Sequence, residues 1–297
     1  MEAIRTQNLQ KNYGKTKVLQ DITLSVAEGA FWGLIGKNGA GKSTLINTLT
    51  GTVLKSGGAF WIYDTPDCKL DCAKKSIGVM PDVSGLYGTM TGAEFLRYMA
   101  SLKGVKLSKS DIKRCLDDVN LDVPFDRKIK DYSFGMKKKI SLAQALVGEP
   151  RLLFLDEPTS GVDPESILHM QGLFHRLHQS GTTVFLASHN LNEIERLCSH
   201  VAILDQGRFR VNGEIDEVIN RYTAVIKVQI HCRIPNDFCT LPAFNFAKLI
   251  EATDNTMLFE VKTQEDISKV IELLISQGIS IYSVIPQKAT LEEIFLR

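Results

Sequence analysis

The chain has 297 residues, of which 44% are hydrophobic and 23% charged, and its formal net charge is +1. This is the composition of a globular chain with a real core, and a field so close to neutral gives no indication of nucleic acid as a partner. The first eight residues lack the apolar region of a signal peptide, and no apolar run approaches the roughly 20 residues that span a bilayer, so we expect no direct membrane span.

The first two thirds of the chain alternate short apolar runs with amphipathic stretches, which is typical of an α/β fold. The pattern predicts, in chain order, a strand over 31–35, helices over 43–50, 91–103, 108–119 and 135–148, a strand over 151–155, a four-turn helix from Pro164, a strand over 182–187, and a hairpin of 199–205 and 208–213. The two strands on either side of the Pro164 helix are almost wholly apolar, as expected in a parallel sheet covered on both faces.

The pattern changes near Asn220, where strands with alternating polarity begin. The remaining residues predict a β-β-α-β-α module made of strands over 223–231 and 257–262, a helix over 264–277, a strand over 280–285 and a helix over 290–296. We therefore divide the chain into a domain of residues 1–220 and an accessory or regulatory domain of residues 221–297. The second domain carries no nucleotide, metal or nucleic-acid motif of its own.

A phosphate-binding loop of the form GxxxxGK[ST] covers residues 36–43, between a predicted strand and a predicted helix. Glycines let backbone N–H groups converge on phosphate oxygens, the amine of Lys42 supplies a positive charge, and the hydroxyl of Ser43 is a ligand for Mg²⁺. A glycine turn without a ligand is the alternative. The residues predicted to bind the nucleotide here are Gly36, Lys37, Asn38, Gly39, Ala40, Gly41, Lys42, Ser43 and Thr44.

A second motif is the apolar run at 152–155 that ends in two carboxylates, Asp156 and Glu157. The first carboxylate is placed to hold Mg²⁺ through water, and the second to polarise the attacking water as general base. Acids that cap a helix would be the ordinary explanation of such a pair taken alone. The phosphate loop upstream favours the catalytic interpretation.

These motifs resemble the nucleotide-binding domain of an ATP-binding-cassette (ABC) transporter, over residues 1 to about 220. The resemblance implies a RecA-like P-loop NTPase core with an antiparallel β-subdomain and a helical subdomain at about 85–150. Residues 132–136 stand where the family has its Leu-Ser-Gly-Gly-Gln signature, although only Ser133 and Gly135 match it. In the family this signature binds the γ-phosphate that the other subunit holds. A serine hydroxyl and a glycine amide at a helix N-terminus form a suitable anion site.

Three further elements of the family follow in register. Residues 160–163 resemble the loop that couples the two sites of the dimer, and His189 resembles the histidine that contacts the γ-phosphate. Tyr13 stands in the place of the aromatic residue that stacks on adenine. Local capping and an ordinary strand-edge position are the alternatives for His189 and Tyr13. Asp82 departs from the family, because it replaces a glutamine; its carboxylate is a candidate metal ligand.

Two segments have no assigned chemistry. Three consecutive lysines, residues 137–139, usually form a solvated helix face, and we expect this of them. Residues 289–295 are similar to the tail of drug, antibiotic and peptide exporter ATPases.

The resemblance implies an ATPase that binds ATP and Mg²⁺ and works as a homodimer or with a paired ABC subunit. It also implies a separate transmembrane permease, which contacts the helical subdomain near residues 85–99 and holds the chain at the cytoplasmic face of the cell membrane. A soluble ABC ATPase that acts on ribosomes or DNA is the alternative, although such proteins usually carry two cassettes or long coiled coils. A small-molecule kinase or a GTPase with the same phosphate loop is a third alternative, which would need a second-substrate lid or a guanine-reading NKxD motif; the sequence has no NKxD.

Overall fold

The structure, a computed structural model, describes residues 1–81, 83–222, 225–233, 245–287 and 290–296. Its contacts divide the chain into two compact units, Met1–Ile215 and Asp216–Arg297. The domain boundary after residue 220 stays a prediction. Within the described residues, none of the helices has both the length and the apolar character needed to cross a membrane.

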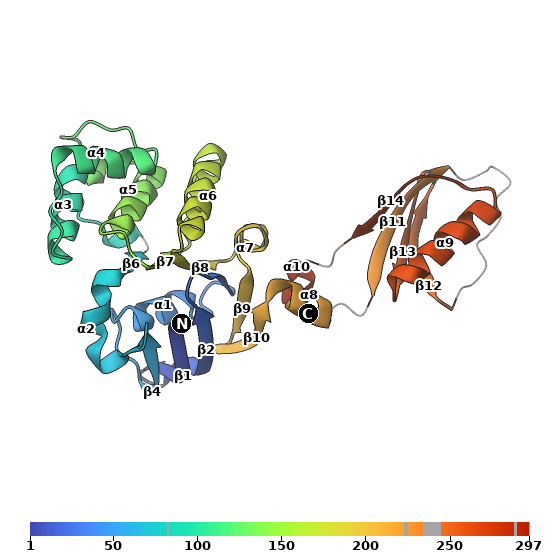
Figure 1. The fold of residues 1–297 in the computed structure, drawn as a ribbon, viewed down its shortest axis with the longest axis horizontal. Coiled ribbons are helices and arrows are strands. Elements are labelled where there is room, and N and C mark those ends of the chain that lie inside the picture. The colour runs from blue at the N-terminus through green and yellow to red at the C-terminus, as the bar shows by residue number, and fades with distance from the viewer. Residues whose placement is uncertain (82, 223–224, 234–244, 288–289, 297) are drawn as a thin grey trace. The chain divides into compact units, whose positions relative to one another are not determined.

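The first unit is built on a six-stranded sheet with the strand order β10-β9-β3-β8-β7-β6 (Figure 1). The strands from β9 to β6 are parallel, and β10 pairs antiparallel with β9 at one edge. Their bounds are β3 (Phe31–Ile35), β6 (Ile77–Met80), β7 (Leu152–Asp156), β8 (Thr183–Ser188), β9 (His200–Asp205) and β10 (Arg208–Glu214). These bounds confirm the strands predicted over 31–35, 151–155 and 182–187 and the predicted hairpin. Every residue of β3, β7 and β8 is buried, as their apolar sequences require.

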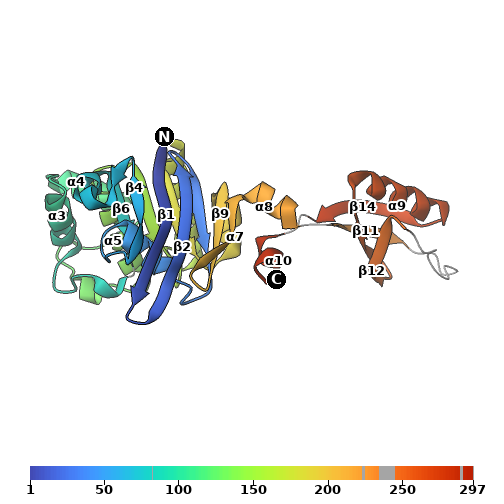
Figure 2. The ribbon, with the colours of Figure 1, turned by 90° about the horizontal axis from the view of Figure 1, so that it is seen from below.

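A second, antiparallel sheet has the order β2-β1-β4-β5. Its strands are β1 (Glu2–Tyr13), β2 (Thr16–Ala27), β4 (Gly57–Ile62) and β5 (Thr65–Pro66), and Figure 2 shows β1 and β2 running side by side. Helix α1 (Lys42–Leu49) shares one hydrophobic core with both sheets, since Leu45 packs in the same cluster as Leu24 of β2 and Phe154 of β7. The start of α1, which carries the phosphate loop, is therefore fixed from two sides.

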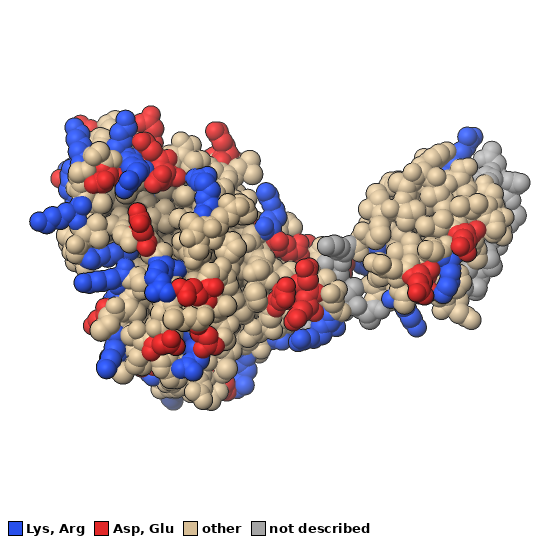
Figure 3. All heavy atoms as spheres, in the orientation of Figure 1, with Lys and Arg blue, Asp and Glu red and all other residues tan. Residues whose placement is uncertain are grey.

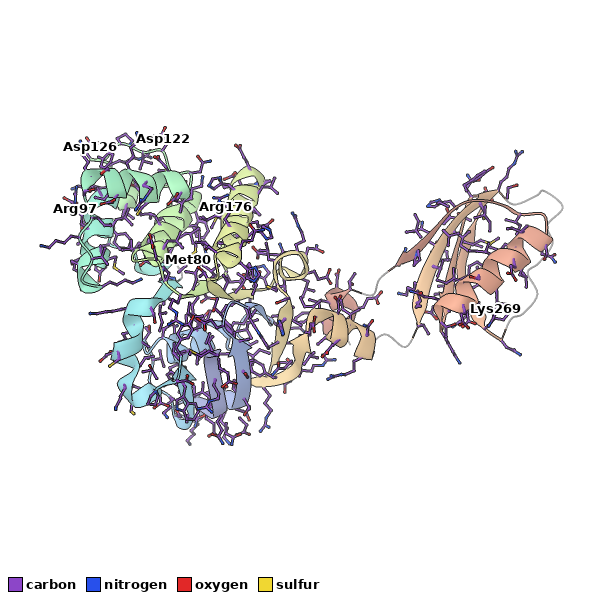
Figure 4. The ribbon with its side chains drawn as sticks, viewed as in Figure 1. Met80, Arg97, Asp122, Asp126, Arg176 and Lys269 are labelled. Carbon is purple, nitrogen blue, oxygen red and sulfur yellow. The ribbon has the colours of Figure 1, made fainter. Side chains whose placement is uncertain are left out.

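The segment between β6 and β7 contains three helices that pack on one another, α3 (Gly92–Leu102), α4 (Lys109–Asp118) and α5 (Phe134–Leu146) (Figure 1). Thr91 and Ser108 begin α3 and α4 with capping boxes, which satisfy the first amides of each helix. In Figure 4, Arg97, Asp122 and Asp126 lie at the outer end of this group, away from Met80 at the end of β6.

Three more helices belong to the first unit, α2 (Leu70–Ala73), α6 (Pro164–Gln179) and α7 (Leu191–Leu197). Helix α6 begins with Pro164 at its first position, and its cap Asp163 accepts a hydrogen bond from the Ser166 amide at 2.9 Å. Helix α6 contacts β8, and α7 contacts β3 and β8. Acidic and basic side chains are interspersed over the face of this unit in Figure 3, in keeping with the near-neutral net charge.

The second unit has a four-stranded antiparallel sheet of order β12-β13-β11-β14, with α9 packed on it. The elements are α8 (Ile215–Tyr222), which begins one residue before the unit, β11 (Ile226–Arg233), β12 (Ala247–Thr253), β13 (Thr256–Val261), α9 (Gln264–Ser276), β14 (Ser280–Gln287) and α10 (Leu291–Leu296). The prediction of three strands is wrong, because it missed β12. Most residues of this edge strand are exposed, and a register shift between Leu249 and Glu251 breaks its alternation.

Candidate functional site

The phosphate loop joins the buried strand β3 to α1. Gly41 has a φ of 107°, in the left-handed region, and a Cβ at this position would meet the carbonyl oxygen of Val18 at 3.1 Å. Conformation and close packing therefore both favour glycine here. Gly41 offers α1 no side-chain cap, so the amides of the first turn are available to an anion.

Lys42, the first residue of α1, is almost fully buried beneath this loop, with 6% of its surface exposed. Its Nζ donates a hydrogen bond to the carbonyl oxygen of Gly36 at 2.7 Å and lies 3.2 Å from Oε1 of Glu157. The second contact is an ion pair without an aligned hydrogen bond, since Oε1 has no hydrogen-bond partner among the described residues. Lys42 thus joins the start of the loop to the end of the β7 motif.

Asp156 is the last residue of β7, and Glu157 begins the turn that follows. Burial raises the pKa of the Asp156 carboxyl above its ordinary value; Glu157 raises this pKa further, whereas hydrogen bonding to Ser43 and the charges of Lys42 and Lys138 lower it. Oδ1 of Asp156 is buried and has no hydrogen-bond partner in the described part of the chain. A buried carboxylate oxygen without a donor, beside a serine hydroxyl, is the kind of hard oxygen set that Mg²⁺ prefers. Asp82, the third predicted metal ligand, lies outside the described residues.

His189 follows β8 directly and contacts the carboxylate of Glu157. Its Nδ1 lies 2.7 Å from Oε2 of Glu157, and its backbone N–H is 3.4 Å from the same oxygen. The two oxygens of Glu157 therefore face Lys42 on one side and His189 on the other. The structure brings together three predicted residues: Glu157 after β7, His189 after β8, and Lys42 at the start of α1. They lie at the carboxyl ends of parallel strands, where α/β proteins bind ligands.

The signature segment at 132–136 forms the start of α5. Ser133 is its N-cap and accepts a hydrogen bond from the Met136 amide at 3.2 Å. Ser133 is exposed, and so is Phe134, which keeps 50% of its surface accessible. This segment lies beside the loop at 160–163. A Cβ added to Gly161 would lie 2.7 Å from Cε1 of Phe134, and a Cβ added to Gly135 would lie 4.0 Å from Oδ2 of Asp163. The signature therefore faces outward beside this loop.

Tyr13 ends β1, where the sheet turns back into β2. Its ring is about half exposed, and the amine of Lys11 lies 4.7 Å from the ring centroid. An exposed aromatic face at a strand end is compatible with stacking on a base.

The expectation that all three lysines at 137–139 form a solvated face is wrong for Lys138. This side chain is 2% exposed, and its Nζ donates a hydrogen bond to the carbonyl oxygen of Glu157 at 2.6 Å. The helical period places Lys138 on the same face of α5 as Ser141 and Leu142, which are both buried, but it does not give the partner that makes burial of the amine favourable.

Glu193 in α7 is a second site residue that the sequence pattern did not reveal. It is 1% exposed and accepts hydrogen bonds from Thr159 Oγ1 at 2.9 Å and from Ser188 Oγ at 2.8 Å. Burial raises its pKa above the ordinary value, the two hydroxyls lower it, and the charge of Glu157 raises it. A glutamate three residues after Asn190 has the position of an ordinary capping acid, so no sequence signal distinguishes this role.

A groove of about 400 Å³ runs from the phosphate loop toward α3. Its lining includes Ser43 and Asp156 as well as the apolar side chains of Tyr87, Phe95 and Leu102. Tyr87 is packed between Phe95 and Tyr98, with ring centroids 6.1 and 5.7 Å away. The groove thus connects the candidate metal ligands with an apolar surface of the helical group.

Comparison with known proteins identifies relatives over nearly the whole chain. A family model described as ABC transporter matches residues 19–160. The bacitracin transport ATP-binding protein BcrA of Enterococcus faecalis is 34% identical over 73% of this chain and 71% of its own length. The linearmycin resistance ATP-binding protein LnrL of Bacillus subtilis is 30% identical over 99% of this chain and 97% of its own. A solved ATP-binding subunit of an ABC transporter superposes with a TM-score of 0.67 at 30% identity, covering 74% of this chain and 92% of that one.

Proposed function

Because this chain belongs to the family of ABC transporter ATP-binding subunits, we propose that it powers an exporter by driving a separate permease. The chain is an ATPase, and ATP is its nucleotide. The observation that carries the site assignment is the placement of Glu157 between Lys42 and His189. The relatives are transporter subunits, which favours this function over a soluble ATPase acting on ribosomes or DNA.

In the proposed site the loop amides and Lys42 bind the phosphates, and Tyr13 stacks on adenine. Glu157 accepts a proton from water as the water oxygen bonds to the γ-phosphorus, and the bond from that phosphorus to the β,γ-bridging oxygen breaks. ADP and inorganic phosphate result. The contact of His189 with Oε2 fixes the orientation of the carboxylate and leaves His189 close to the reacting phosphate. The buried position of Lys42 strengthens its attraction for phosphate, since little water screens it.

The proposed Mg²⁺ ligands are Ser43 and Asp156, with Asp82 added on its sequence position. The unsatisfied Oδ1 of Asp156 supports this assignment. When bound, the ion neutralises charge on the β- and γ-phosphates. Metal binding requires the ionised carboxylate, so the affinity for Mg²⁺ should fall as the pH falls. Because the pKa of Asp156 is raised, this loss should begin at a higher pH than for an ordinary carboxylate.

The proposed working unit contains two such chains, or this chain with a paralogue. The exposure of Ser133 at the N-terminus of the 13-residue helix α5 supports this arrangement, because the anion site that it forms faces away from its own chain. Each ATP would then lie between the phosphate loop of one subunit and the signature of the other. ATP closes the pair, and loss of the γ-phosphate lets it open, which moves the permease.

The surface proposed for the permease is the apolar part of the groove lining, where Tyr87 and Leu102 are exposed, together with the exposed Tyr98 beside Tyr87. Contact with the permease would hold the chain at the inner face of the cell membrane. Residues 221–297 are proposed to form an accessory domain, since every catalytic motif precedes them. The bacitracin and linearmycin relatives suggest antibiotic or peptide compounds as the class of cargo.

Affinity purification from detergent-solubilised membranes tests this function. We expect a polytopic membrane protein to bind the wild-type chain and to stimulate its ATPase activity after reconstitution in proteoliposomes. The variant Leu102→Asp should lose the partner but keep its basal ATPase activity, because Leu102 lies on the exposed surface. Recovery of ribosomes instead, with stimulation of the ATPase by ribosomes, would refute the transporter function.

A further inference from the structure

Two buried charged side chains hold the turn that carries Glu157, and neither belongs to the motifs that predicted the site. The first is Lys138 of α5. Its amine lies 2.6 Å from the carbonyl oxygen of Glu157, in hydrogen-bonding geometry. The ring of Phe134, one turn earlier in the same helix, lies 5.7 Å from this amine. The helix that begins with the signature is thus bonded directly to the backbone of the proposed general base.

The second side chain is Glu193 of α7, which holds the other end of the turn. One carboxylate oxygen accepts from Thr159, two residues after Glu157, and the other accepts from Ser188, the residue before His189. The hydroxyl oxygen of Ser188 also accepts from the Asn190 amide at 3.0 Å. Glu193 therefore ties the turn after β7 to the backbone on both sides of His189.

The conformation of this turn explains why such support is needed. Glu157 has a φ of 49°, in the left-handed region, a strained conformation that a non-glycine residue keeps only where the surrounding structure enforces it. The Glu157 amide donates to the carbonyl oxygen of Ala187 at 2.9 Å, and its carbonyl accepts from Lys138. The N–H and the C=O of Glu157 are both held by these bonds, so the peptide units on either side of its Cα are fixed, and with them the direction of the side chain.

Burying an ammonium and a carboxylate is expensive, and apolar residues of similar size usually give an equally stable fold. The charge of Lys138 also acts on Asp156, and both groups hold the segment that presents Glu157 and His189. Their placement therefore indicates a role in the reaction more than a role in stability.

We propose that Lys138 and Glu193 are positioning residues that clamp the 157–159 turn between α5 and α7 and so hold Glu157 in its catalytic orientation. This inference rests on the proposed function of Glu157 as general base. Neither side chain needs to touch the nucleotide. Loss of the clamp should lower kcat and leave nucleotide affinity almost unchanged.

The decisive variant is Lys138→Met, which removes the amine and keeps most of the side-chain volume. The matched control is Lys139→Met, because Lys139 also donates to a backbone carbonyl, that of Asn120 at 3.0 Å, but outside the site. We expect kcat to fall about 10- to 100-fold in Lys138→Met, the loss typical of a misplaced catalytic group. The control should stay near wild type, and both variants should bind ATP with dissociation constants within about twofold of it.

A double-mutant cycle separates positioning from general destabilisation. If Lys138 acts through Glu157, adding Lys138→Met to Glu157→Gln should reduce the residual single-turnover rate no further. Glu193 gives an independent test: Glu193→Leu should lower kcat, whereas Glu193→Gln should preserve it, since an amide can still pair with both hydroxyls. Melting curves check that each variant is folded.

Equal kcat values for Lys138→Met and Lys139→Met would overturn the clamp, as would additive losses in the double variant. The outcome for Glu157→Gln is separate. Wild-type turnover in that single variant would refute the proposed function of Glu157 itself. An inactive Glu157→Gln with a fully active Lys138→Met would refute only the clamp.

Discussion

The substitution Gly161→Ala tests whether the 160–163 loop and the signature work as one unit. Gly161 has a φ of 72°, and its Cα faces the ring of Phe134. An alanine Cβ would lie 2.7 Å from Cε1 of that ring, about 0.7 Å short of ordinary contact. Because Phe134 is half exposed, its ring can turn outward, which changes the surface beside Ser133 at the start of α5.

The left-handed φ of Gly161 determines the expected loss of stability, and the contact with Phe134 determines the expected loss of turnover. A left-handed φ costs alanine about 1–2 kcal/mol, and the loss of chain entropy in the unfolded state returns about 0.4–1 kcal/mol. The net loss of about 1 kcal/mol lowers the melting temperature by about 2–4 °C. Displacement of Phe134 adds a second effect, which acts on Ser133 and the proposed γ-phosphate contact, and we expect turnover to fall by about 10-fold.

The control is Gly104→Ala, because Gly104 has a φ of 76° with open space around its Cα. Calorimetry of Gly104→Ala should show the loss of stability that the left-handed φ causes alone, and only Gly161→Ala should lose ATPase activity. Replacement of Phe134 by leucine in the Gly161→Ala background should restore part of that activity by making room for the Cβ. Equal ATPase rates for the two alanine variants would show that the contact between Gly161 and Phe134 has no part in turnover.

Three other changes test separate parts of the site. Lys42→Ala should abolish most ATP binding or turnover, because phosphate loses its nearest side-chain cation; equilibrium binding and phosphate release measure this, and wild-type values would contradict the loop assignment. Asp156→Asn should lower turnover yet raise the melting temperature of the nucleotide-free protein at pH 7. The sign follows from the raised pKa: the folded state disfavours the charged form, so wild-type stability is reduced above the ordinary carboxyl pKa, and the gain from asparagine should shrink as the pH falls toward it. Calorimetry at several pH values measures the gain, and an unchanged melting temperature would contradict it. A chain ending at residue 222 should still bind ATP, since every catalytic motif precedes that point; lost affinity in a well-folded truncated protein would show that the boundary is misplaced.

The strands of the parallel core were predictable because they are buried on both faces and therefore consist almost wholly of apolar residues. Strands β3 and β7 bury every residue, so their apolar runs could be recognised without knowing the fold. The proximity of Glu157 and His189 was also predictable in outline, since both follow buried parallel strands that pair side by side. Edge strand β12 was missed because it buries little and contains a bulge, so its sequence carries almost no periodic signal.

Lys138 and Glu193 show a different limit of sequence reasoning. Charged residues are almost never fully buried unless they are paired, so a lysine run or a capping glutamate is ordinarily assigned to the surface. What buries Lys138 is the turn at Glu157, 19 residues away, which α5 meets only in the folded chain. The partner that makes burial favourable cannot be read from the local sequence.

Glu157 is proposed to act as general base for ATP hydrolysis in a site shared by two subunits, and the Glu157→Gln variant tests this most directly. The amide keeps the shape of the side chain but cannot accept a proton from water at neutral pH. Size-exclusion chromatography with ATP and Mg²⁺, together with a phosphate-release assay, reports association and turnover on one sample. We expect the variant to bind ATP, to hydrolyse it very slowly and to elute as a dimer that returns to monomer when ATP is removed. A variant that hydrolyses ATP at the wild-type rate and elutes identically with and without ATP would contradict the account.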